Sequence, residues 1–309
     1  MTVSLQITIR HLRAFVAVAE EEHFGRAAAA LHLTSSALSQ TLRQLEAAVG
    51  ADLVRRTTRS VALTPTGEAA LEPARHALAA FDAALERIQE VARGEAGVLR
   101  VGYVIGAGLE LMPAVIRAFE RDVPTVELKL REYDFTRPDA GLESGEVDIA
   151  FLRPPLRIAD LTYLPLLEEP RVVCLPDGHR LAGHEYVRVK DIIDEPIIAA
   201  PTEDEVWRGY WILRPQREGR PANVVEEAPT FEAEFQAIAA GRGISTTGLT
   251  AARYYSRPGI SFSLIADLPP TEVALAWREE SHSIVARFVE IAAEVKRAFD
   301  ARAIEAPSR

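Results

Sequence analysis

Apolar residues in the first fifty positions recur every three or four residues, which is the spacing of amphipathic helices. The clearest stripe follows i, i+4, i+7 and i+11 and comprises Leu38, Leu42, Leu45 and Val49. Thr34 is suited to cap the start of this helix, and Gly50 is suited to end it. Two shorter helices are predicted before it, and two β-prone runs at 53–56 and 60–63 predict a hairpin after it.

A longer helical pattern covers residues 66–93, with apolar positions separated by alternating steps of three and four, as in a coiled-coil seam. A helix of this length, ~40 Å, is longer than the short segment before it can cover, so we predict that it forms a dimer. The residues expected at the dimer seam are Leu71, Leu78, Phe81, Leu85 and Ile88. The alternative is that the stripe packs against its own domain. Pro73 predicts that the first turn of this helix is irregular or kinked.

After a glycine-containing connection at 94–97, strand patterns alternate with helical ones. Strands are expected at 98–104, 126–131, 147–151, 161–167, 171–175, 197–200 and 273–277. Helices are expected at 109–120, 231–240 and 283–300. This alternation predicts an α/β fold with a mainly parallel sheet covered on both faces. The expected division is a helical domain at 8–67, a linker helix at 68–93 and an α/β domain at 94–309.

Composition narrows the class of protein. Of the 309 residues, 48% are hydrophobic and 26% charged, which is typical of a globular chain and excludes a disordered or collagen-like one. No apolar run approaches the ~20 residues of a membrane span, and the N-terminus does not resemble a signal peptide, so a cytoplasmic protein is expected. The single cysteine, Cys174, excludes an internal disulfide and a four-cysteine zinc site.

The net charge of −10 is unevenly distributed. Arginines and acidic residues balance over residues 1–93, so the negative charge belongs to the remainder of the chain. Residues 23–67 carry a local excess of arginine, which suits a segment that meets phosphate groups. Chance fluctuation in a short window is the alternative, and charge alone does not decide between the two.

The polar side of the predicted third helix carries side chains that suit a DNA groove. Small hydroxyls and an amide at the start of a helix, followed by arginine, can reach base edges and phosphates in a major groove. Arginines in the hairpin can hold the flanking backbone. The candidate DNA-binding residues are Thr34, Ser35, Ser36, Ser39, Gln40, Arg43, Arg56 and Arg59. An ordinary solvated surface beside an ordinary turn is the alternative for either element taken alone.

Residues 15–67 resemble the winged helix-turn-helix of LysR-type transcriptional regulators. The marks of the resemblance, in order, are Phe24, Ala27-Ala28, Leu31, Ala37-Leu38-Ser39, Leu45-Glu46, Gly50, Leu53, Arg56, Leu63-Thr64 and Gly67. One departure concerns Ser35-Ser36, which stand where the family usually has Gln-Pro at the start of its recognition helix. Serine reaches less far than glutamine, so the resemblance leaves the base preference open.

The resemblance continues more weakly through 99–132, 142–155, 237–245 and 274–282, which are similar to the family's effector domain. It implies a periplasmic-binding-protein-like fold of two α/β lobes with a small-molecule effector between them. It also implies a bacterial regulator that binds an interrupted palindrome in double-stranded DNA as a dimer, assembles further into a tetramer, and contacts RNA polymerase if it activates. No cofactor, metal, enzymatic activity or membrane partner is expected.

Ligands of α/β folds lie beyond strand C-termini, near helix N-termini that favour anions. The effector-binding residues expected on this basis are Ile105, Gly106, Ala107, Phe135, Thr136, Arg137, Arg153, Pro154 and Thr202. Arg137 and Arg153 could pair with a carboxylate, which predicts an organic or aromatic acid; solvated surface arginines are the alternative. An apolar effector held mainly by Ile105, Phe135 and Pro154 is a further possibility. Thr246-Thr247-Gly248 replace the family's usual apolar residues and weaken the expectation of a pocket there.

Other chemistry has little support in the sequence. His179 and His184 lack the spacing and carboxylate context of a metal site. Cys174 lies in a strand-like run and is predicted to be a small core residue. The acidic run 203–205 is more typical of a solvated helix start than of a cation site. A transport protein would not need residues 15–67, an enzyme would need a catalytic constellation that is not found, and a nonspecific architectural DNA binder would carry more basic charge.

Overall fold

A computed structural model describes residues 7–56, 61–93, 97–279 and 283–305. It divides into two compact units near Gly97, with the short segment Ser144–Glu146 grouped with the N-terminal one. Residues 94–96 of the glycine-containing connection, where Gly94 is suited to end the long helix, and the tip of the hairpin at 57–60 lie outside the described residues. Each unit is treated below by itself.

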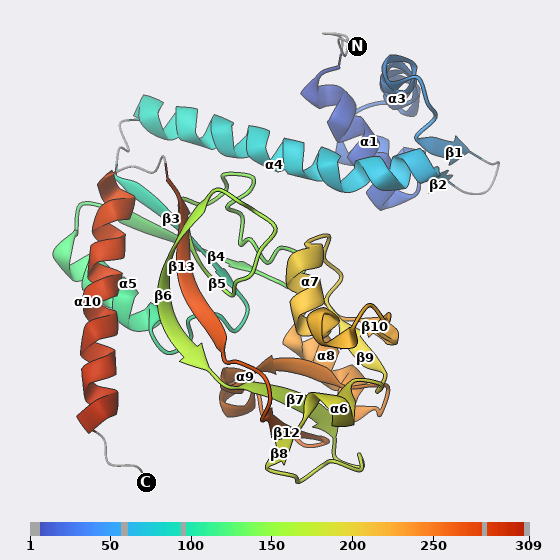
Figure 1. Cartoon of the computed structure of the whole chain (residues 1–309). Coiled ribbons are helices and arrows are strands. Elements are labelled where there is room, and N and C mark those ends of the chain that lie inside the picture. Colours follow the sequence, from blue (N-terminus) through green and yellow to red (C-terminus); the bar gives the residue numbers. More distant parts are fainter. Residues whose placement is uncertain (1–6, 57–60, 94–96, 280–282, 306–309) are drawn as a thin grey trace. The chain divides into compact units, whose positions relative to one another are not determined.

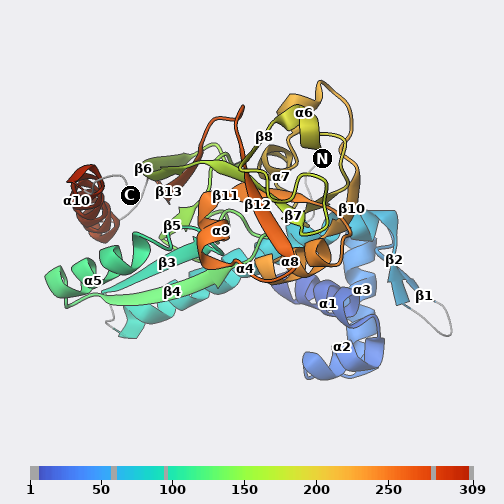
Figure 2. The ribbon, with the colours of Figure 1, turned by 90° about the horizontal axis from the view of Figure 1, so that it is seen from below.

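The N-terminal unit begins with three helices packed around a small apolar core (Figure 2). They are α1 (Ile9–Glu21), α2 (Phe24–Ala30) and α3 (Ser35–Val49), followed by the antiparallel pair β1 (Val54–Arg56) and β2 (Val61–Leu63). The predicted stripe of α3 is buried at Leu38, Leu42 and Leu45, whereas Val49 is exposed. The three helices and the hairpin are therefore those predicted from the apolar pattern.

The predicted ends of α3 are confirmed. The Thr34 hydroxyl accepts a hydrogen bond from the Ala37 N–H at 3.2 Å and caps the start of the helix. Gly50 ends it with φ of 79°, a left-handed conformation that glycine adopts without strain.

The long helix α4 (Pro65–Arg93) contains 29 residues. It runs continuously through Pro73, so the expected irregular first turn is not found. The reason is that the helix begins well before Pro73 and already has its first turn stabilised by Thr64, whose hydroxyl accepts a hydrogen bond from the Gly67 N–H at 3.0 Å.

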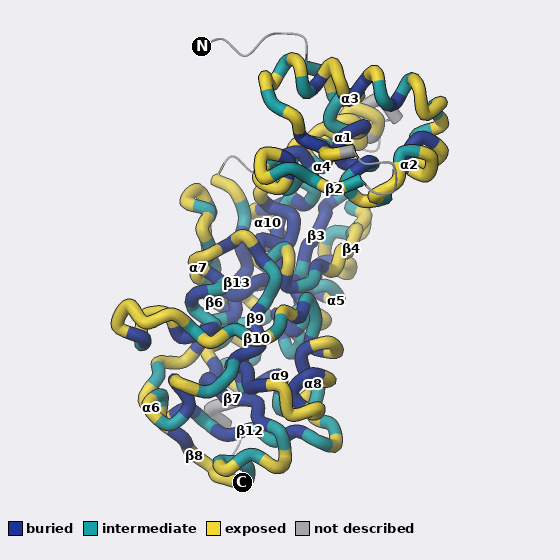
Figure 3. Tube along the Cα trace, turned by 90° about the vertical axis from the view of Figure 1, so that its right-hand side faces the viewer, coloured by how far each residue is buried: buried dark blue, intermediate teal, exposed yellow. Residues whose placement is uncertain are grey.

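The first lobe of the C-terminal unit is a five-stranded sheet in the order β4-β3-β5-β13-β6. Its strands are β3 (Val98–Val104), β4 (Glu127–Tyr133), β5 (Ile149–Leu152), β6 (Leu161–Glu169) and β13 (Thr271–Arg278). Strands β3 and β13 are mostly buried (Figure 3). Helices α5 (Met112–Asp122) and α10 (Ser283–Glu305) pack together through Phe119 and Phe288, whose ring centres are 5.1 Å apart.

The second lobe is built from shorter elements. Its strands are β7 (Arg171–Pro176), β8 (Tyr186–Val187), β9 (Ile197–Ala199), β10 (Val224–Glu227), β11 (Ser245–Gly248) and β12 (Ile260–Ile265). Its helices are α6 (Val189–Ile192), α7 (Glu205–Trp211), α8 (Phe231–Ala239) and α9 (Leu249–Tyr254), with a 3-10 turn at Arg214–Arg217. One sheet has the order β11-β7-β12-β8, and β9 pairs separately with β10.

The expectation of a mainly parallel sheet is wrong. In the first lobe β3 is parallel to β4 and β5, but β13 is antiparallel to β5 and β6. In the second lobe β7 is antiparallel to both of its neighbours, β11 and β12. The reason is the path of the chain: β6 leads into β7 of the second lobe, and the chain returns after β12 through β13, which re-enters the first sheet in the opposite direction (Figure 1).

Candidate nucleic-acid interface and inter-lobe cavity

The polar face of α3 is open to solvent. Ser35, Ser36, Gln40 and Arg43 are exposed, and the Arg43 guanidinium donates to the Ser39 backbone oxygen one turn earlier, at 3.2 Å. The opposite side of the same helix is held in the core by Leu38 and its stripe. The helix therefore presents hydroxyl, amide and guanidinium groups together, as expected from its sequence.

The hairpin candidates are described only in part. Arg56 ends β1, and its partner in β2 is Val61. Arg59 lies outside the described residues. Arg55, on the same strand, is exposed and its guanidinium donates to the Leu63 backbone oxygen at 3.4 Å. The described part of the hairpin thus carries an exposed arginine that was not among the candidates.

Three of the residues that marked the resemblance position the hairpin instead of facing a partner. The Glu46 carboxylate accepts hydrogen bonds from the N–H groups of Leu53 and Val54, at 3.0 and 3.2 Å, and so ties β1 to α3. The Thr64 hydroxyl donates to the Asp52 backbone oxygen at 2.7 Å. A Cβ atom on Gly67 would lie only 2.1 Å from the Leu53 backbone oxygen, so only glycine fits where α4 passes the hairpin. Their place in the family pattern signalled importance, but not this structural role.

The residues of the predicted dimer seam differ in burial along α4. Leu71 and Leu78 are partly buried against the core of their own unit, as the alternative interpretation proposed. Phe81, Leu85 and Ile88 are exposed, by 36%, 38% and 64%. The second half of the stripe is therefore the part that the unit leaves uncovered.

A cavity of about 40 Å³ lies between the two lobes of the C-terminal unit. Its lining comprises Val104, Ile105, Phe135, Arg153, Ile198, Ala199, Ala200, Trp207, Trp211, Phe231, Glu234, Ser245, Thr246 and Thr247. Ile105, Phe135 and Arg153 were expected there. Thr246 and Thr247, whose polarity weakened the expectation of a pocket there, both contribute to this lining. Its volume holds on the order of one or two water molecules, so a larger ligand requires the lobes to separate.

Arg153 is not a solvated surface residue. It is 6% exposed, its guanidinium lies 2.5 Å from the Glu169 carboxylate, and it donates to the Gly106 backbone oxygen at 3.0 Å. Glu169 also accepts a hydrogen bond from the Thr250 N–H at the start of α9. This buried network joins the end of β5 to the second lobe, and the arginine expected to bind an effector carboxylate already has a protein carboxylate as its partner.

The other expected cleft residues do not line the cavity. Gly106 and Ala107 lie beside it, with the Gly106 oxygen occupied by Arg153 and Ala107 buried. Thr136 is exposed and donates to Asp134.

Arg137 lies 3.1 Å from the Asp139 carboxylate. Pro154 is partly buried before a cis peptide bond, and the buried Thr202 hydroxyl accepts from the Asp204 N–H at 3.2 Å. Asp204 in turn caps α7, which confirms the helix start predicted at 203–205, although Asp204 is itself buried.

Aromatic side chains form much of the cavity wall. Phe135 from the first lobe packs edge-on against Phe231 and lies 5.8 Å from Trp207, measured between ring centres. Trp207 and Trp211 both come from α7, one turn apart, and their rings meet at 68°. The apolar pattern missed α7 because the helix has only seven residues, too few for a helical period to emerge.

Glu234 is the acidic residue in the cavity lining. Burial raises its pKa to about 7, and the nearby Ser245 side chain opposes part of that rise. Cys174 on the neighbouring strand β7 is buried, and burial raises the pKa of its thiol. The thiol is therefore protonated, in agreement with the prediction of a core residue.

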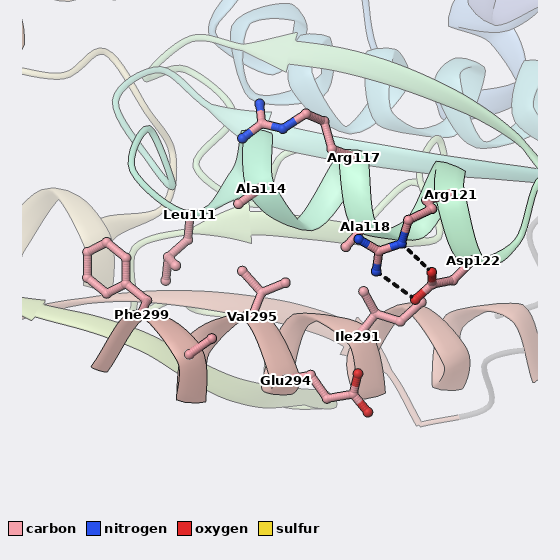
Figure 4. A pocket seen from close by; sticks show the side chains of 11 residues that line it. Leu111, Ala114, Arg117, Ala118, Arg121, Asp122, Ile291, Glu294, Val295 and Phe299 are labelled. Atoms are coloured by element: carbon pink, nitrogen blue, oxygen red, sulfur yellow. Dashed lines mark hydrogen bonds and ion pairs between the residues drawn. The ribbon is translucent and has the colours of Figure 1, made fainter. Parts of the chain in front are cut away.

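A second, larger cavity of about 370 Å³ is a groove between α5 and α10 (Figure 4). Leu111, Val295 and Phe299 supply its apolar surface, and Arg121 is paired with Asp122 at 2.7 Å along one edge. It shares no lining residue with the inter-lobe cavity.

Among the described residues no cluster of three or more His, Cys, Asp and Glu side chains could hold a metal ion. Within the same residues, no helix has the length and apolar character to span a membrane.

Comparison with known families decides the identity of both units. The family described as "Bacterial regulatory helix-turn-helix protein, lysR family" matches residues 9–68, and "LysR substrate binding domain" matches residues 92–297. The chain belongs to the LysR family of transcriptional regulators. It is therefore a DNA-binding regulator with an effector-binding domain, and relatives over about nine tenths of its length are named as transcriptional regulators.

Several LysR-family relatives align over nearly the whole chain. The regulator AlsR of Bacillus subtilis is 34% identical over 92% of this chain and 94% of its own length. The regulator IlvR of Caulobacter vibrioides is 31% identical over 88% of this chain and 92% of its own. Among solved structures, a cysteine mutant of Corynebacterium glutamicum OxyR with bound hydrogen peroxide is 28% identical, covers 95% of this chain and 92% of its own, and has a TM-score of 0.54. The LysR regulator CbnR, 23% identical with a TM-score of 0.58 over 94% and 99% of the two chains, shows the same fold.

Proposed function

We propose that this LysR-family regulator binds an interrupted palindrome in double-stranded DNA as a homodimer. Each protomer places α3 in a major groove and the β1–β2 hairpin, with Arg56 and Arg59, on the flanking phosphates. The observation that carries this proposal is the exposed face of α3, where Ser35, Ser36 and Gln40 can reach base edges and Arg43 can reach a phosphate. Thr34 and Ser39 complete the surface.

The proposed dimer forms through α4, where Phe81, Leu85 and Ile88 leave an apolar stripe uncovered. In this proposal residues 8–67 bind DNA, 68–93 link and dimerise, and 94–309 bind the effector. Pairs of dimers joined through the effector domains form a tetramer, which contacts RNA polymerase if the regulator activates. Its DNA target places the protein in the cytoplasm.

The proposed effector is a small organic acid bound in the inter-lobe cavity. Residues of both lobes line this cavity, so a ligand there contacts both lobes at once. A ligand changes a conformational equilibrium only as far as its affinity differs between the two states. A molecule that fits between the lobes satisfies that condition, because its contacts depend on how far apart the lobes are.

Selection of bound fragments from a genomic library tests the DNA part of the proposal. The full chain is expected to enrich interrupted palindromes, and addition of organic acids is expected to alter the enrichment or the affinity. Binding without sequence preference, with an affinity set by salt concentration alone, would overturn the proposal in favour of an architectural DNA binder.

A further inference from the structure

Two residues that line the inter-lobe cavity carry hydrogen-bond donors that no described protein group uses. The indole nitrogens of Trp207 and Trp211 are shielded from solvent, and neither has a hydrogen-bond partner among the residues that the structure describes. Trp207 as a whole is 4% exposed. An indole nitrogen donates and does not accept, so this lining favours a ligand that supplies acceptor oxygens.

The fixed charges beside the cavity leave one positive charge without a carboxylate. Arg153 is paired with Glu169. The Arg171 guanidinium lies buried over the rings of Tyr210 and Trp211, 4.2 and 5.4 Å from their centres, and donates to the Tyr210 backbone oxygen. Within the described part of the chain it has no acidic partner, and arginine remains protonated in proteins. Its charge favours an anion in the cavity.

Glu234 determines whether an anion can enter. Two ionised carboxylates in one buried site repel each other, so one of them takes up a proton. The groups around Glu234 set this balance: the Ser245 side chain on β11 lies near it and lowers its pKa, and Cys174 on β7 is a neutral thiol. Strands β9 and β12, which also pack against α8, contribute no titratable side chain.

The remaining charged groups near α8 are engaged elsewhere. Arg257, which lies near Cys174, is paired with the exposed Glu232. Arg153 is part of the cavity lining, and Arg171 lies against the ring of Trp211, which also lines the cavity. When Glu234 is ionised, it and Glu169 balance the charges of the two arginines. When Glu234 is protonated, these four groups have a net charge of +1, which a single anion can neutralise.

Building on the proposed function, we propose that the effector is a short aliphatic carboxylate that binds together with one proton. Its oxygens accept hydrogen bonds from the indoles of Trp207 and Trp211, and the proton, taken from solvent, resides on Glu234. The cavity volume of about 40 Å³ restricts the ligand to the smallest acids in the described conformation. Trp207, Trp211 and Glu234 then determine specificity, and Arg153 positions the lobes.

The proton makes binding depend on pH. Burial places the pKa of Glu234 at about 7, so its protonated fraction falls about tenfold from pH 6 to pH 8, whereas a free aliphatic acid stays ionised throughout that range. The affinity for acetate is expected to fall about tenfold over the same interval. Glu234→Gln carries a permanently neutral group, so this variant is expected to bind acetate equally at both values.

Titration calorimetry and tryptophan fluorescence with formate, acetate and propionate test the proposal, with acetamide and methylammonium as comparison ligands. Trp207→Phe and Trp211→Phe keep an aromatic ring but remove a donor, and each is expected to weaken acetate binding at least fivefold, about 1 kcal/mol. Two matched controls are expected to behave as the unmodified protein. Glu232→Gln removes an exposed carboxylate from the same helix, and Trp277→Phe changes the one tryptophan outside the cavity.

The pH dependence of the unmodified protein needs no variant and is decisive by itself. Constant affinity from pH 6 to pH 8, equal binding of acetamide, or absence of binding by all three acids would overturn the inference. Preference for methylammonium would do the same, because it would show an ionised Glu234 and a cation among the aromatic rings. A gel shift on the same preparation distinguishes failure of this inference from failure of the proposed function. Intact DNA binding without a response to acids overturns this inference alone. Absence of sequence-specific DNA binding overturns the proposed function.

Discussion

The fold buries the Glu234 carboxyl group, and burial disfavours its ionised form. Its side chain is buried beside aromatic rings, and that burial raises its pKa to about 7 from an ordinary value of 4.5. A carboxyl group with a raised pKa stabilises the folded protein only while it is protonated. Stability is therefore greatest below pH 4.5 for this group and is lost as the pH rises through about 7.

Glu234→Gln should remove this dependence. From the shift in pKa, the unmodified protein loses about 3 kcal/mol of unfolding free energy between pH 4.5 and pH 8 through this group. The difference between variant and unmodified protein is expected to favour the variant increasingly over that range. Urea unfolding followed by tryptophan fluorescence measures it, because all three tryptophans belong to the C-terminal unit. A difference that does not change with pH would contradict the burial of an ionisable carboxyl here.

Arg43→Ala should weaken DNA binding without unfolding the protein, because its guanidinium is exposed on the polar face of α3. Loss of one phosphate contact lowers the slope of log affinity against log salt by about 0.9. Gel shifts at several salt concentrations measure that slope. Arg117→Ala, which removes an equally exposed arginine from α5, serves as the control and should leave the slope unchanged. Equal slopes for both variants would exclude Arg43 from the interface.

The roles of individual arginines were the least predictable part of the site. Sequence placed Arg137 and Arg153 after strands, and both are near strand ends, but each is paired with a carboxylate of the protein, Asp139 and Glu169. Asp139 is two residues from its partner and could have been suspected. Glu169 is at the far end of another strand, and its pairing depends on a sheet order that sequence spacing does not contain.

At the scale of elements, α4 serves two purposes in succession. Its first half packs Leu71, Ala74 and Leu78 against the N-terminal core, and Arg13 of α1 pairs with Asp82 at 2.5 Å. Beyond that point its apolar residues are uncovered. A single unbroken heptad pattern in the sequence therefore combines a contact within one chain with an uncovered apolar surface, which is the proposed contact with a second copy.

Leu85→Glu combined with Ile88→Glu tests the second half of α4. Unpaired charges buried at an interface cost several kcal/mol, so light scattering is expected to show a smaller species than the unmodified protein. Leu78 is left intact because its change would disturb the N-terminal core. Gln89→Glu adds a charge at an exposed position on the same helix and should leave the mass unchanged. An unaltered mass for the double variant, with its helix content retained, would place the dimer contact elsewhere.

The elements that sequence predicted and missed differ in length and polarity. Strand β3 and helix α8 were predicted almost to the residue because their apolar residues follow a regular period. Strand β11 was missed because Ser245, Thr246 and Thr247 are polar although buried. Short strands such as β8 give too few residues for any period to emerge. These elements belong to the second lobe, which is why the cavity wall was predicted mostly on the side of the first.

At the scale of the whole effector domain, one buried ion pair holds the lobes in register. Glu169 stands at the crossing from β6 to β7, where it contacts Arg153 of the first lobe and the Thr250 N–H of the second. The pair lies beside the inter-lobe cavity, because Arg153 is part of its lining. Any motion of the lobes that a ligand causes must therefore accommodate this network.

Glu169→Gln should destabilise the C-terminal unit by about 3–5 kcal/mol, because the Arg153 guanidinium would remain buried without a carboxylate. Urea unfolding monitored by tryptophan fluorescence is the measurement. Glu168→Gln makes the same chemical change one residue earlier on an exposed side chain, and it should cost less than about 1 kcal/mol. Similar midpoints for the two variants would show that the pair contributes little to the stability of the C-terminal unit.

The position of β13 in the chain affects when the first sheet can be completed during synthesis. This strand lies between β5 and β6, yet it follows the entire second lobe in the chain. During synthesis β5 lacks one of its two neighbours until residues 271–278 have left the ribosome, so the first lobe cannot close while the second is being made. Because the proposed effector cavity needs both lobes, we expect a nascent chain to bind an effector there only after β13 has joined the first sheet.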